Sequence, residues 1–366
     1  MKFLTGTFII LCSMSSAAVL ADSKTNLDVD GVNQSQSGAL NSQKMDVGNA
    51  KAGLLGSAKS NVKAKNINQS QSGALNSQKM EIGNAKAGLL GGAESNVQVD
   101  GVNQKQSGAL NSQSMAIGNS QAGLLGGAKA DVNAKNVNQS QSGALNSQKM
   151  DIGEAKGGLL GKAESNVRVD GVNQNQSGAL NSQSMAVGNA QAGLIGGAKS
   201  NVTAKNVNQA QSGALNSQKM EIGSAKGGLL GKAESNVQVD GINQKQSGAL
   251  NSQSMALGNA QAGLIGGAKS NVSAKNVNQA QSGALNSQKM DIGNATGGLL
   301  GKAESNVRVD GINQSQSGAL NSQSLRIGNA KGGLLSSATS TVTAKNISQS
   351  QSGALNSQAT NLGNTE

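Results

Sequence analysis

The residues able to do acid–base, nucleophilic or metal chemistry are few in this chain of 366 residues. There is no histidine and the only cysteine is Cys12, so imidazole bases, thiolate nucleophiles and His/Cys metal sites are missing from the rest of the chain. Carboxylates are the only remaining groups for acid and base catalysis. Composition therefore argues against an enzyme, and we expect no cofactor and no metal site.

Two short segments and one recurring residue are similar to parts of ligand sites. Residues 157–163 (GGLLGKA) are similar to a phosphate-binding loop, but Lys156 stands at the first glycine position and Ala163 replaces the Ser or Thr that would meet magnesium. Residues 26–31 match the start of a calcium loop that no Glu closes, so we predict a turn. Met45 and its equivalents alternate with apolar residues, which favours a core role over soft-metal ligation.

Charged residues recur in two columns at a spacing of 35 residues, and their sign alternates along each column. The first column reads Asp30, Lys65, Asp100, Lys135, Asp170, Lys205 and onward to Lys345; the second reads Lys59, Glu94, Lys129, Glu164 and onward to Glu304. Equivalent residues in a parallel stack lie about 4.8 Å apart, so alternation replaces repulsion by attraction and specifies register. The alternatives are ordinary solubilising charges and duplication of a 70-residue pair.

Amide and glycine columns repeat with the same period. Stacking would run the amides into ladders along the axis, and a proline-free chain keeps every backbone donor that such a stack needs. A glycine in a turn would supply positive φ. The amide columns start Gln36, Asn41 and Gln43, then Gln71, Asn76 and Gln78; the turn column starts Gly48, Gly83 and Gly118.

The elements that must position these columns follow from an exact repeat. The string QSGALNSQ begins at Gln36 and returns every 35 residues as far as Gln351. With Gly31 as the start, nine units cover 31–345, a truncated tenth covers 346–366, and a short segment, 22–30, precedes them. A fixed period of this kind indicates a solenoid or stacked array. Helical repeats have similar periods, but the abundance of Gly, Asn and Ser disfavours helices here.

Short alternating pieces, such as residues 32–36, 45–47 and 97–99, predict strands with one face inward. We predict turns at Gly48-Asn49, around residues 53–56, and at Asp100-Gly101 or Lys65-Asn66 at the end of the unit. The apolar columns predicted to form a narrow core start at Leu40, Val47, Leu54, Ala58 and Val62.

The predicted fold class is all-β: a repetitive β-solenoid, or stacked cross-β layers, built from 35-residue repeats. One unit makes either one layer or two shorter rungs. Charge alternation favours one layer, because two rungs would separate equivalent charges by about 9.6 Å.

The N-terminus has the pattern of an export signal. Lys2 precedes the apolar run 8–11, and small residues lead to Ala21, so residues 1–21 read as a signal peptide. A lipid anchor at Cys12 is the alternative, but Leu11 stands before it where a small residue is expected. No later apolar stretch reaches about 18 residues. We therefore expect a secreted product with no membrane span after signal removal.

This combination resembles secreted bacterial functional amyloids of the curli and Fap type. The basis is a signal peptide followed by regular Gly/Ala/Ser/Asn/Gln-rich units with amides at fixed places. Ser37 to Gln43 gives the S-x5-Q spacing of curlin units, while Gly48-Asn49 is similar to their later G-N at a different distance; the longer unit is closer in size to Fap repeats. The resemblance implies export across the outer membrane and nucleated polymerisation outside the cell.

We therefore predict a secreted structural protein that assembles into extracellular, amyloid-like fibres at the cell surface, for biofilm matrix, adhesion or cell aggregation. An open C-terminal end, with nothing bulky in residues 364–366, suits such growth. The expected partners are further copies of the chain, a dedicated nucleator, outer-membrane export machinery and anionic matrix polymers that lysines such as Lys44, Lys79 and Lys149 would contact. Without aromatic platforms, specific nucleic-acid binding is not expected. The alternative function is an ice- or surface-binding solenoid that does not polymerise.

Overall fold

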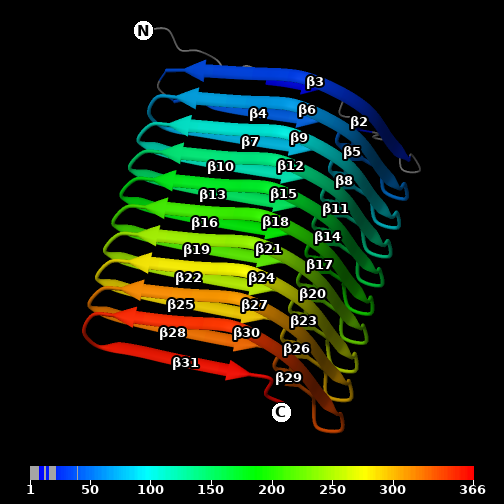
Figure 1. The fold of residues 1–366 in the computed structure, drawn as a ribbon. Helices are drawn as coiled ribbons and strands as arrows, with labels where there is room; N and C mark the ends of the chain where they lie inside the picture. The colour runs from blue at the N-terminus through cyan, green and yellow to red at the C-terminus, as the bar shows by residue number, and fades with distance from the viewer. Residues whose placement is uncertain (1–7, 12–13, 16–21, 39) are drawn as a thin grey trace.

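The computed structural model describes residues 8–11, 14–15, 22–38 and 40–366, and this part of the chain contains β-strands but no helix. The strands form three parallel sheets that run side by side along one axis (Figure 1). Because no helix occurs in these ranges, none of the described elements is a helix able to span a membrane. The predicted all-β solenoid is confirmed.

The three sheets differ in strand length. The long strands are β3 (Ser23–Ser37), β6 (Ala58–Ser72), β9 (Ala93–Ser107), β12 (Ala128–Ser142), β15 (Ala163–Ser177), β18 (Ala198–Ser212), β21 (Ala233–Ser247), β24 (Ala268–Ser282), β27 (Ala303–Ser317) and β30 (Ala338–Ser352). The medium strands are β1 (Phe8–Leu11), β4 (Ser42–Val47), β7 (Asn76–Ile82), β10 (Leu110–Ile117), β13 (Leu145–Ile152), β16 (Leu180–Val187), β19 (Leu215–Ile222), β22 (Leu250–Leu257), β25 (Leu285–Ile292), β28 (Leu320–Ile327) and β31 (Asn356–Leu362). The short strands are β2 (Met14–Ser15), β5 (Ala50–Lys51), β8 (Ala85–Lys86), β11 (Ser120–Gln121), β14 (Ala155–Lys156), β17 (Ala190–Gln191), β20 (Ala225–Lys226), β23 (Ala260–Gln261), β26 (Ala295–Thr296) and β29 (Ala330–Lys331).

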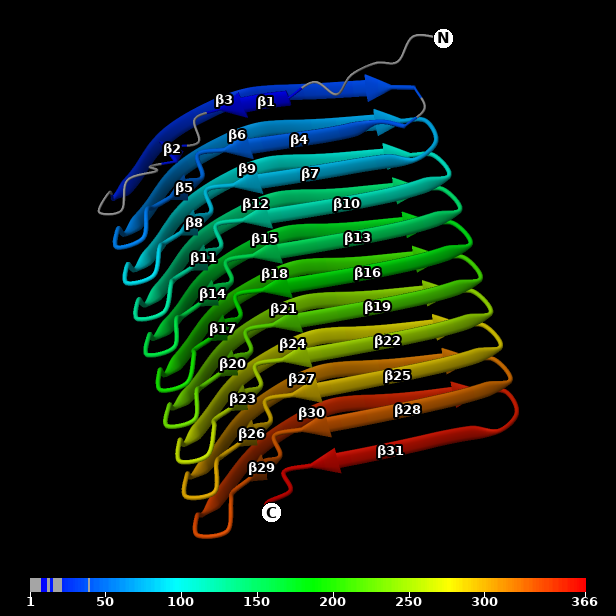
Figure 2. The same cartoon turned by 180° about the vertical axis from the view of Figure 1, so that it is seen from behind.

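Each 35-residue unit makes one layer, as charge alternation favoured. Neighbouring long strands pair in parallel with equivalent residues opposite, so that Val132 lies between Val97 and Val167. The medium strands keep the same spacing from β4 onward. The long and medium strands form two faces, and the short strands lie along one edge between them (Figures 1 and 2). Equivalent side chains are therefore brought together along the whole array.

Each long strand bends at one residue near its middle. This residue is Gly or Asn in alternate layers, and it has positive φ, for example 71° at Gly101 and 51° at Asn136. Lys135 and Asn136 both face solvent, so the inward alternation changes phase there, and pairing resumes at Val137. The turn predicted at this place, closing the unit, is wrong, because a single left-handed residue bends a strand without ending its pairing.

The interior is a thin core shared by all layers. Aliphatic and methionine side chains from the long and medium strands form one cluster, and alanines near the short strands form a second. Met80 and Met115 are fully buried, which confirms their predicted core role. The columns of Val47, Ala58 and Val62 are also buried. The predicted core columns of Leu40 and Leu54 are wrong: these leucines sit at corners of the layer and project outward.

The unit boundaries chosen from the sequence do not coincide with the layers. Gly31 lies in the middle of β3, and residues 23–30 form the first half of that strand. Most of the predicted signal peptide, including the cleavage position at Ala21, lies outside the described residues. Of that segment the structure describes β1, which pairs with β4, and β2, which pairs with β5.

Candidate functional site

Two of the predicted amide columns form hydrogen-bonded ladders inside the solenoid. On the long strands, the Gln71 Nε2 donates to the Gln36 Oε1 at 3.4 Å, and the Gln106 Nε2 donates to the Gln71 Oε1 at 3.0 Å. On the medium strands, the Gln78 Nε2 donates to the Gln43 Oε1 at 3.0 Å. All these side chains are buried. Each layer thus donates to the layer before it, and the ladders have a direction.

A third glutamine ladder escaped the sequence analysis. It starts at Gln34 and recurs in every layer on the same inward face, two residues before the Gln36 column. The Gln139 Nε2 donates to the Gln104 Oε1 at 2.8 Å and to the Lys149 carbonyl oxygen, on the medium strand, at 3.2 Å. Two features of the sequence indicate this ladder: the glutamine recurs every 35 residues, and it stands two residues before the Gln36 column, on the same face of the strand. This ladder links the layers to one another and the two faces to each other.

The asparagine column that starts at Asn41 holds a corner of the layer. The Asn76 Nδ2 donates to the Gly73 carbonyl oxygen at 2.6 Å and to the Ser107 carbonyl oxygen, one layer on, at 3.0 Å. Asn41 makes the equivalent two bonds in the first layer. These amides therefore give the Gly38 and Gly73 carbonyl oxygens a donor, and they add a second hydrogen bond to serine carbonyl oxygens that already accept a backbone N–H.

The predicted glycine column lies at the opposite end of the medium strands. Gly48, Gly83 and Gly118 have φ of 63°, 64° and 64°. A Cβ on Gly118 would lie 2.4 Å from the Val132 Cγ2, so the position needs glycine for space as well as for conformation. The buried Ser95 hydroxyl donates to the Gly83 carbonyl oxygen at 2.5 Å. This corner fixes the medium strands against the long strands.

The charge column that starts at Lys59 forms ion pairs between layers. The Lys59 Nζ lies 2.9 Å from a Glu94 carboxylate oxygen. Hydrogen bonds from Lys59 and a neighbouring asparagine lower the pKa of Glu94 below its ordinary value. Lys129 lies between Glu94 and Glu164 in the register, but its Nζ pairs with Asp131 on its own strand at 2.9 Å. Further interlayer pairs are Lys199–Glu234 and Lys269–Glu304.

The charge column that starts at Asp30 lies at the bend of the long strands. Asp100, Lys135 and Asp170 are opposite one another in the register. Within the described residues, no two members of this column form an ion pair within 4.0 Å. The Asp100 carboxylate instead accepts a hydrogen bond from the Asn136 Nδ2, in the next layer, at 2.8 Å. The same bond joins Asn66 to Asp30 and Asn206, beside Lys205, to Asp170.

Ion pairs within single medium strands were not predicted. The Lys79 Nζ lies 2.8 Å from a Glu81 carboxylate oxygen, and the Lys149 Nζ lies 2.6 Å from an Asp151 carboxylate oxygen. The hydrogen bond that the Lys149 ammonium donates to the Asp151 carboxylate raises the pKa of Lys149. The sequence pattern that indicates such a pair is a Lys two residues before an Asp or Glu, because both side chains then lie on the same face of the strand. These lysines, and Lys44 beside its own aspartate, therefore already have carboxylate partners.

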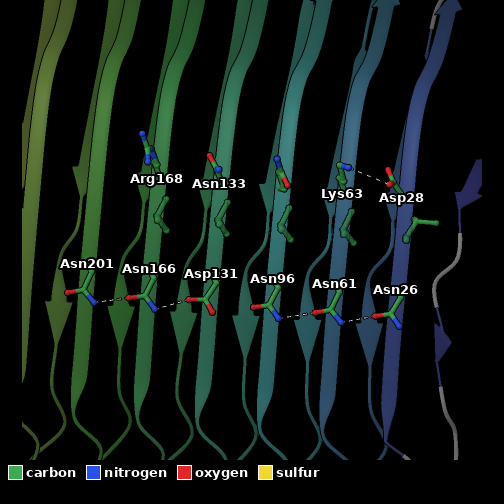
Figure 3. Close-up of a pocket in the computed structure, with 16 residues that line it drawn as sticks. Asn26, Asp28, Asn61, Lys63, Asn96, Asp131, Asn133, Asn166, Arg168 and Asn201 are labelled. Atoms are coloured by element: carbon green, nitrogen blue, oxygen red, sulfur yellow. Dashed lines mark hydrogen bonds and ion pairs between the residues drawn. The ribbon is translucent and has the colours of Figure 1, made fainter.

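A shallow groove follows the outside of the long strands, and Figure 3 shows the side chains that line its first layers. One row of it is an asparagine ladder, in which the Asn61 Nδ2 donates to the Asn26 Oδ1 at 2.7 Å. The ladder is interrupted between Asn96 and Asp131, because a carboxylate has no N–H to donate to the preceding layer (Figure 3). The side chains of this row bond mainly to one another. In the second row of the groove, the Asn133 Oδ1 is buried and has no hydrogen-bond partner among the described residues.

Leucines form exposed rows along two corners of the stack. Leu89 and Leu90 lie in the turn before β9 and are 44% and 45% exposed, and Leu145 at the other corner is 41% exposed. Equivalent residues repeat this exposure from layer to layer. The segment similar to a phosphate loop belongs to one such turn, with Leu159 and Leu160 at its tip. The solenoid therefore has rows of exposed leucines on its outer surface in addition to the buried apolar core.

The two end layers differ from the layers between them. Inward side chains that are buried in β27 become partly exposed in β30, and β31 is exposed throughout. In the first layer, the Gln36 Nε2 and the Gln43 Nε2 are buried and have no hydrogen-bond partner within the described ranges. Unpaired strand edges and unpaired buried amides are points at which another chain can bind. The end layers are therefore the candidate functional site.

No family model, curated protein or solved structure matches the chain. Among residues 8–11, 14–15, 22–38 and 40–366 there is also no group of three or more acidic, His or Cys side chains placed to hold a metal ion. The function must therefore be argued from the geometry of the layers and their ends.

Proposed function

We propose that the protein is a secreted structural subunit that joins end to end into extracellular, amyloid-like fibres. The observation that supports this is the continuity of the layers: every layer presents a long strand, a medium strand and the same amide columns. In the described part of the chain, the outer edges of β3, β30 and β31 have no neighbouring strand, and the outer edge of β4 is paired only with β1. Adding a further copy would bury inward side chains that β30 leaves partly exposed. It would also give the edge backbone groups hydrogen-bond partners, which favours association.

Interactions between layers support a polymer over an isolated stack. A parallel, in-register arrangement pairs identical side chains between neighbours, which is the arrangement that stabilises cross-β fibres. In this chain the pairing already holds between layers, for example between Gln148 and Gln113 at 2.9 Å. A junction between copies needs no new type of contact, because it would repeat the contact that each layer makes with the next.

The biological setting of the proposal rests on the signal-peptide pattern and on the resemblance to curli-type and Fap-type proteins. We propose roles in biofilm matrix, surface adhesion or cell aggregation, with a dedicated nucleator and outer-membrane export machinery as partners. We also propose anionic matrix polymers as partners, with weaker binding. Lys79 and Lys149 pair with carboxylates, so attraction would come from other lysines such as Lys105, which has uncharged neighbours in its column.

The proposal is tested with the purified chain from Asp22. We expect it to form filaments after a lag that added seeds shorten, with a fibre diffraction reflection near 4.8 Å along the axis. Electron microscopy and X-ray fibre diffraction provide the measurements. A chain that stays monomeric in the presence of seeds would overturn the proposed function.

A further inference from the structure

We propose that copies of this chain join in one direction only, with the last layer of one copy against the first layer of the next, and that amide polarity and charge parity specify this junction. The inference deepens the proposed fibre function and rests on it. The partner at each end is a second copy of the chain. The two end layers, β3 with β4 and β30 with β31, form the interface.

Amide polarity makes the two ends complementary. In the glutamine ladders each Nε2 donates to the layer before it, as Gln351 does to Gln316 at 2.8 Å. The first layer therefore ends the ladders on the unpartnered donors of Gln36 and Gln43. The last layer ends them on acceptors, because the Oε1 atoms of Gln351 and Gln358 receive no hydrogen bond from a described residue.

Only one way of joining pairs these groups. When a first layer follows a last layer, Gln36 of one copy can donate to Gln351 of the other, and Gln43 can donate to Gln358. Joining two first layers, or two last layers, requires one copy to be turned over, so the facing strands run antiparallel and the glutamine columns of the two copies do not meet. Both arrangements leave buried amides unpaired, which is costly. The ladders therefore favour a fibre in which all copies point the same way.

Charge parity makes the same choice independently. The column that starts at Asp30 alternates in sign over ten layers, and ten is an even number, so it ends on Lys345. A first layer placed on a last layer puts Asp30 next to Lys345 and continues the alternation without a fault. The bend column also continues its order of Asn and Gly, with Gly31 following Asn346, as Gly101 follows Asn66. Joining like ends would run the facing long strands antiparallel and would continue neither order.

The N-terminal strands bear on when this junction can form. β1 pairs with β4 on the edge that β31 of another copy would occupy. The junction therefore requires the chain that starts at Asp22. Within one such chain, Asp30 and Lys345 lie nine layers apart, or about 43 Å at the usual strand spacing. Any coupling between these two residues in assembly must therefore arise between copies.

A double-mutant cycle on the chain from Asp22 tests the junction. The variants are Asp30→Lys, Lys345→Glu and the two together, with elongation measured from sheared seeds of the same variant at low salt. Each single variant places like charges at the junction, so we expect elongation about five- to tenfold slower than in the parent. The double variant restores opposite charges there, and we expect it to elongate several-fold faster than either single variant. Circular dichroism checks that each variant retains its strands.

The matched control is Asp100→Lys with Lys275→Glu, singly and together. These changes alter net charge in the same way, but the residues lie five layers apart and do not meet at a junction. Their effects should combine without recovery. Equal recovery in the control pair, or no recovery in the Asp30–Lys345 pair while the parent forms filaments, would overturn the directional junction and leave the fibre proposal standing. A parent that never forms filaments would overturn both.

Discussion

The buried amide columns and the exposed charge columns share one 35-residue period but hold the layers together differently. Gln148 is 1% exposed and bonds to both neighbouring layers at 2.9 Å. Lys59 and Glu94 also lie 2.9 Å apart, but their side chains are 41% and 36% exposed. A lost partner is costly in the interior, where water cannot replace it, whereas an exposed ion pair contributes about 0–1 kcal/mol. The interior columns therefore dominate stability.

The buried and the exposed columns differ in sequence, and this difference explains why the chain has both. The buried columns carry the same residue in every layer, so they fix how each layer lies on the next but do not distinguish one layer from another. The charge columns alternate, except where Lys24 lies opposite Lys59 in the first two layers, so a shift by one layer places like charges together, and a shift by two layers mostly does not. The amides specify which residues of neighbouring layers lie opposite one another. The charges distinguish odd-numbered layers from even-numbered layers. Weak charges suffice for this because they only need to discriminate between otherwise equal arrangements.

The largest effect is expected from breaking a buried ladder. Gln148→Ala leaves the Gln113 Oε1 without its donor and removes the acceptor of the Gln183 Nε2. It also leaves a cavity in the core. We expect a loss of about 3 kcal/mol in the free energy of unfolding, measured by chemical denaturation followed by circular dichroism.

An exposed residue on the same strand provides the control for Gln148. Ser147→Ala changes a neighbouring side chain that faces solvent. We expect it to alter the free energy of unfolding by less than about 0.5 kcal/mol. If both variants unfold at the same denaturant concentration, the buried amides do not hold the layers as proposed.

An intermediate effect is expected where a charge occupies an otherwise uncharged column. Asn119 accepts the Glu154 backbone N–H at 2.8 Å, and Asn189 accepts that of Ser224 at 2.9 Å, but Glu154 stands between them with a side chain 18% exposed. Burial, followed by the nearby Asp151 carboxylate, raises the pKa of Glu154. Glu154→Asn removes the poorly solvated charge and supplies the amide that this column uses elsewhere. We expect this variant to be more stable than the parent at neutral pH, by less than the effect of Gln148→Ala, because loss of the 3.6 Å ion pair with Lys156 offsets part of the gain.

The stabilisation expected from Glu154→Asn depends on pH. A raised carboxyl pKa means that the folded chain holds the proton more tightly than the unfolded chain. The Glu154 contribution therefore favours folding at low pH and is lost as the pH rises through the ordinary Glu value, near 4.3, toward the raised value. The advantage of Glu154→Asn should grow over the same interval. Parallel stability curves for parent and variant between pH 4 and 7 would contradict it.

The fold was accessible from the sequence because its physical cause is periodic. An exact repeat, alternating polarity and a sign change every 35 residues are enough to predict a stack with one layer per unit. The turn predicted at Gly48 is also confirmed. Gly48 and its equivalents have positive φ and pack closely on a valine side chain. These properties depend on residue type at a fixed place, which a sequence displays directly.

The wrong predictions concern positions at which the residue type does not determine whether the side chain faces the core or whether the strand ends. Leu40 and Leu54 recur as regularly as Val47, but a thin layer has no interior at its corners, so they face outward. Asp100-Gly101 has the composition of a turn, yet the neighbouring layers keep the strand paired on both sides of it. The Gln34 ladder was missed because polar residues at fixed places were not all assigned to the inward face.

The smallest effect is expected from the exposed column, and it isolates parity from net charge. Lys135→Glu with Lys205→Glu places five negative charges in succession, from Asp100 to Asp240, without touching the core. The matched control is Lys105→Glu with Lys245→Glu, which changes net charge equally beside uncharged Ser and Ala neighbours. We expect the first variant to be about 1 kcal/mol less stable than the control at low salt and to elongate more slowly. Screening over about 3 Å at 1 M salt should remove most of that difference. A difference that persists at high salt, or none at low salt, would show that these charges do not report layer parity.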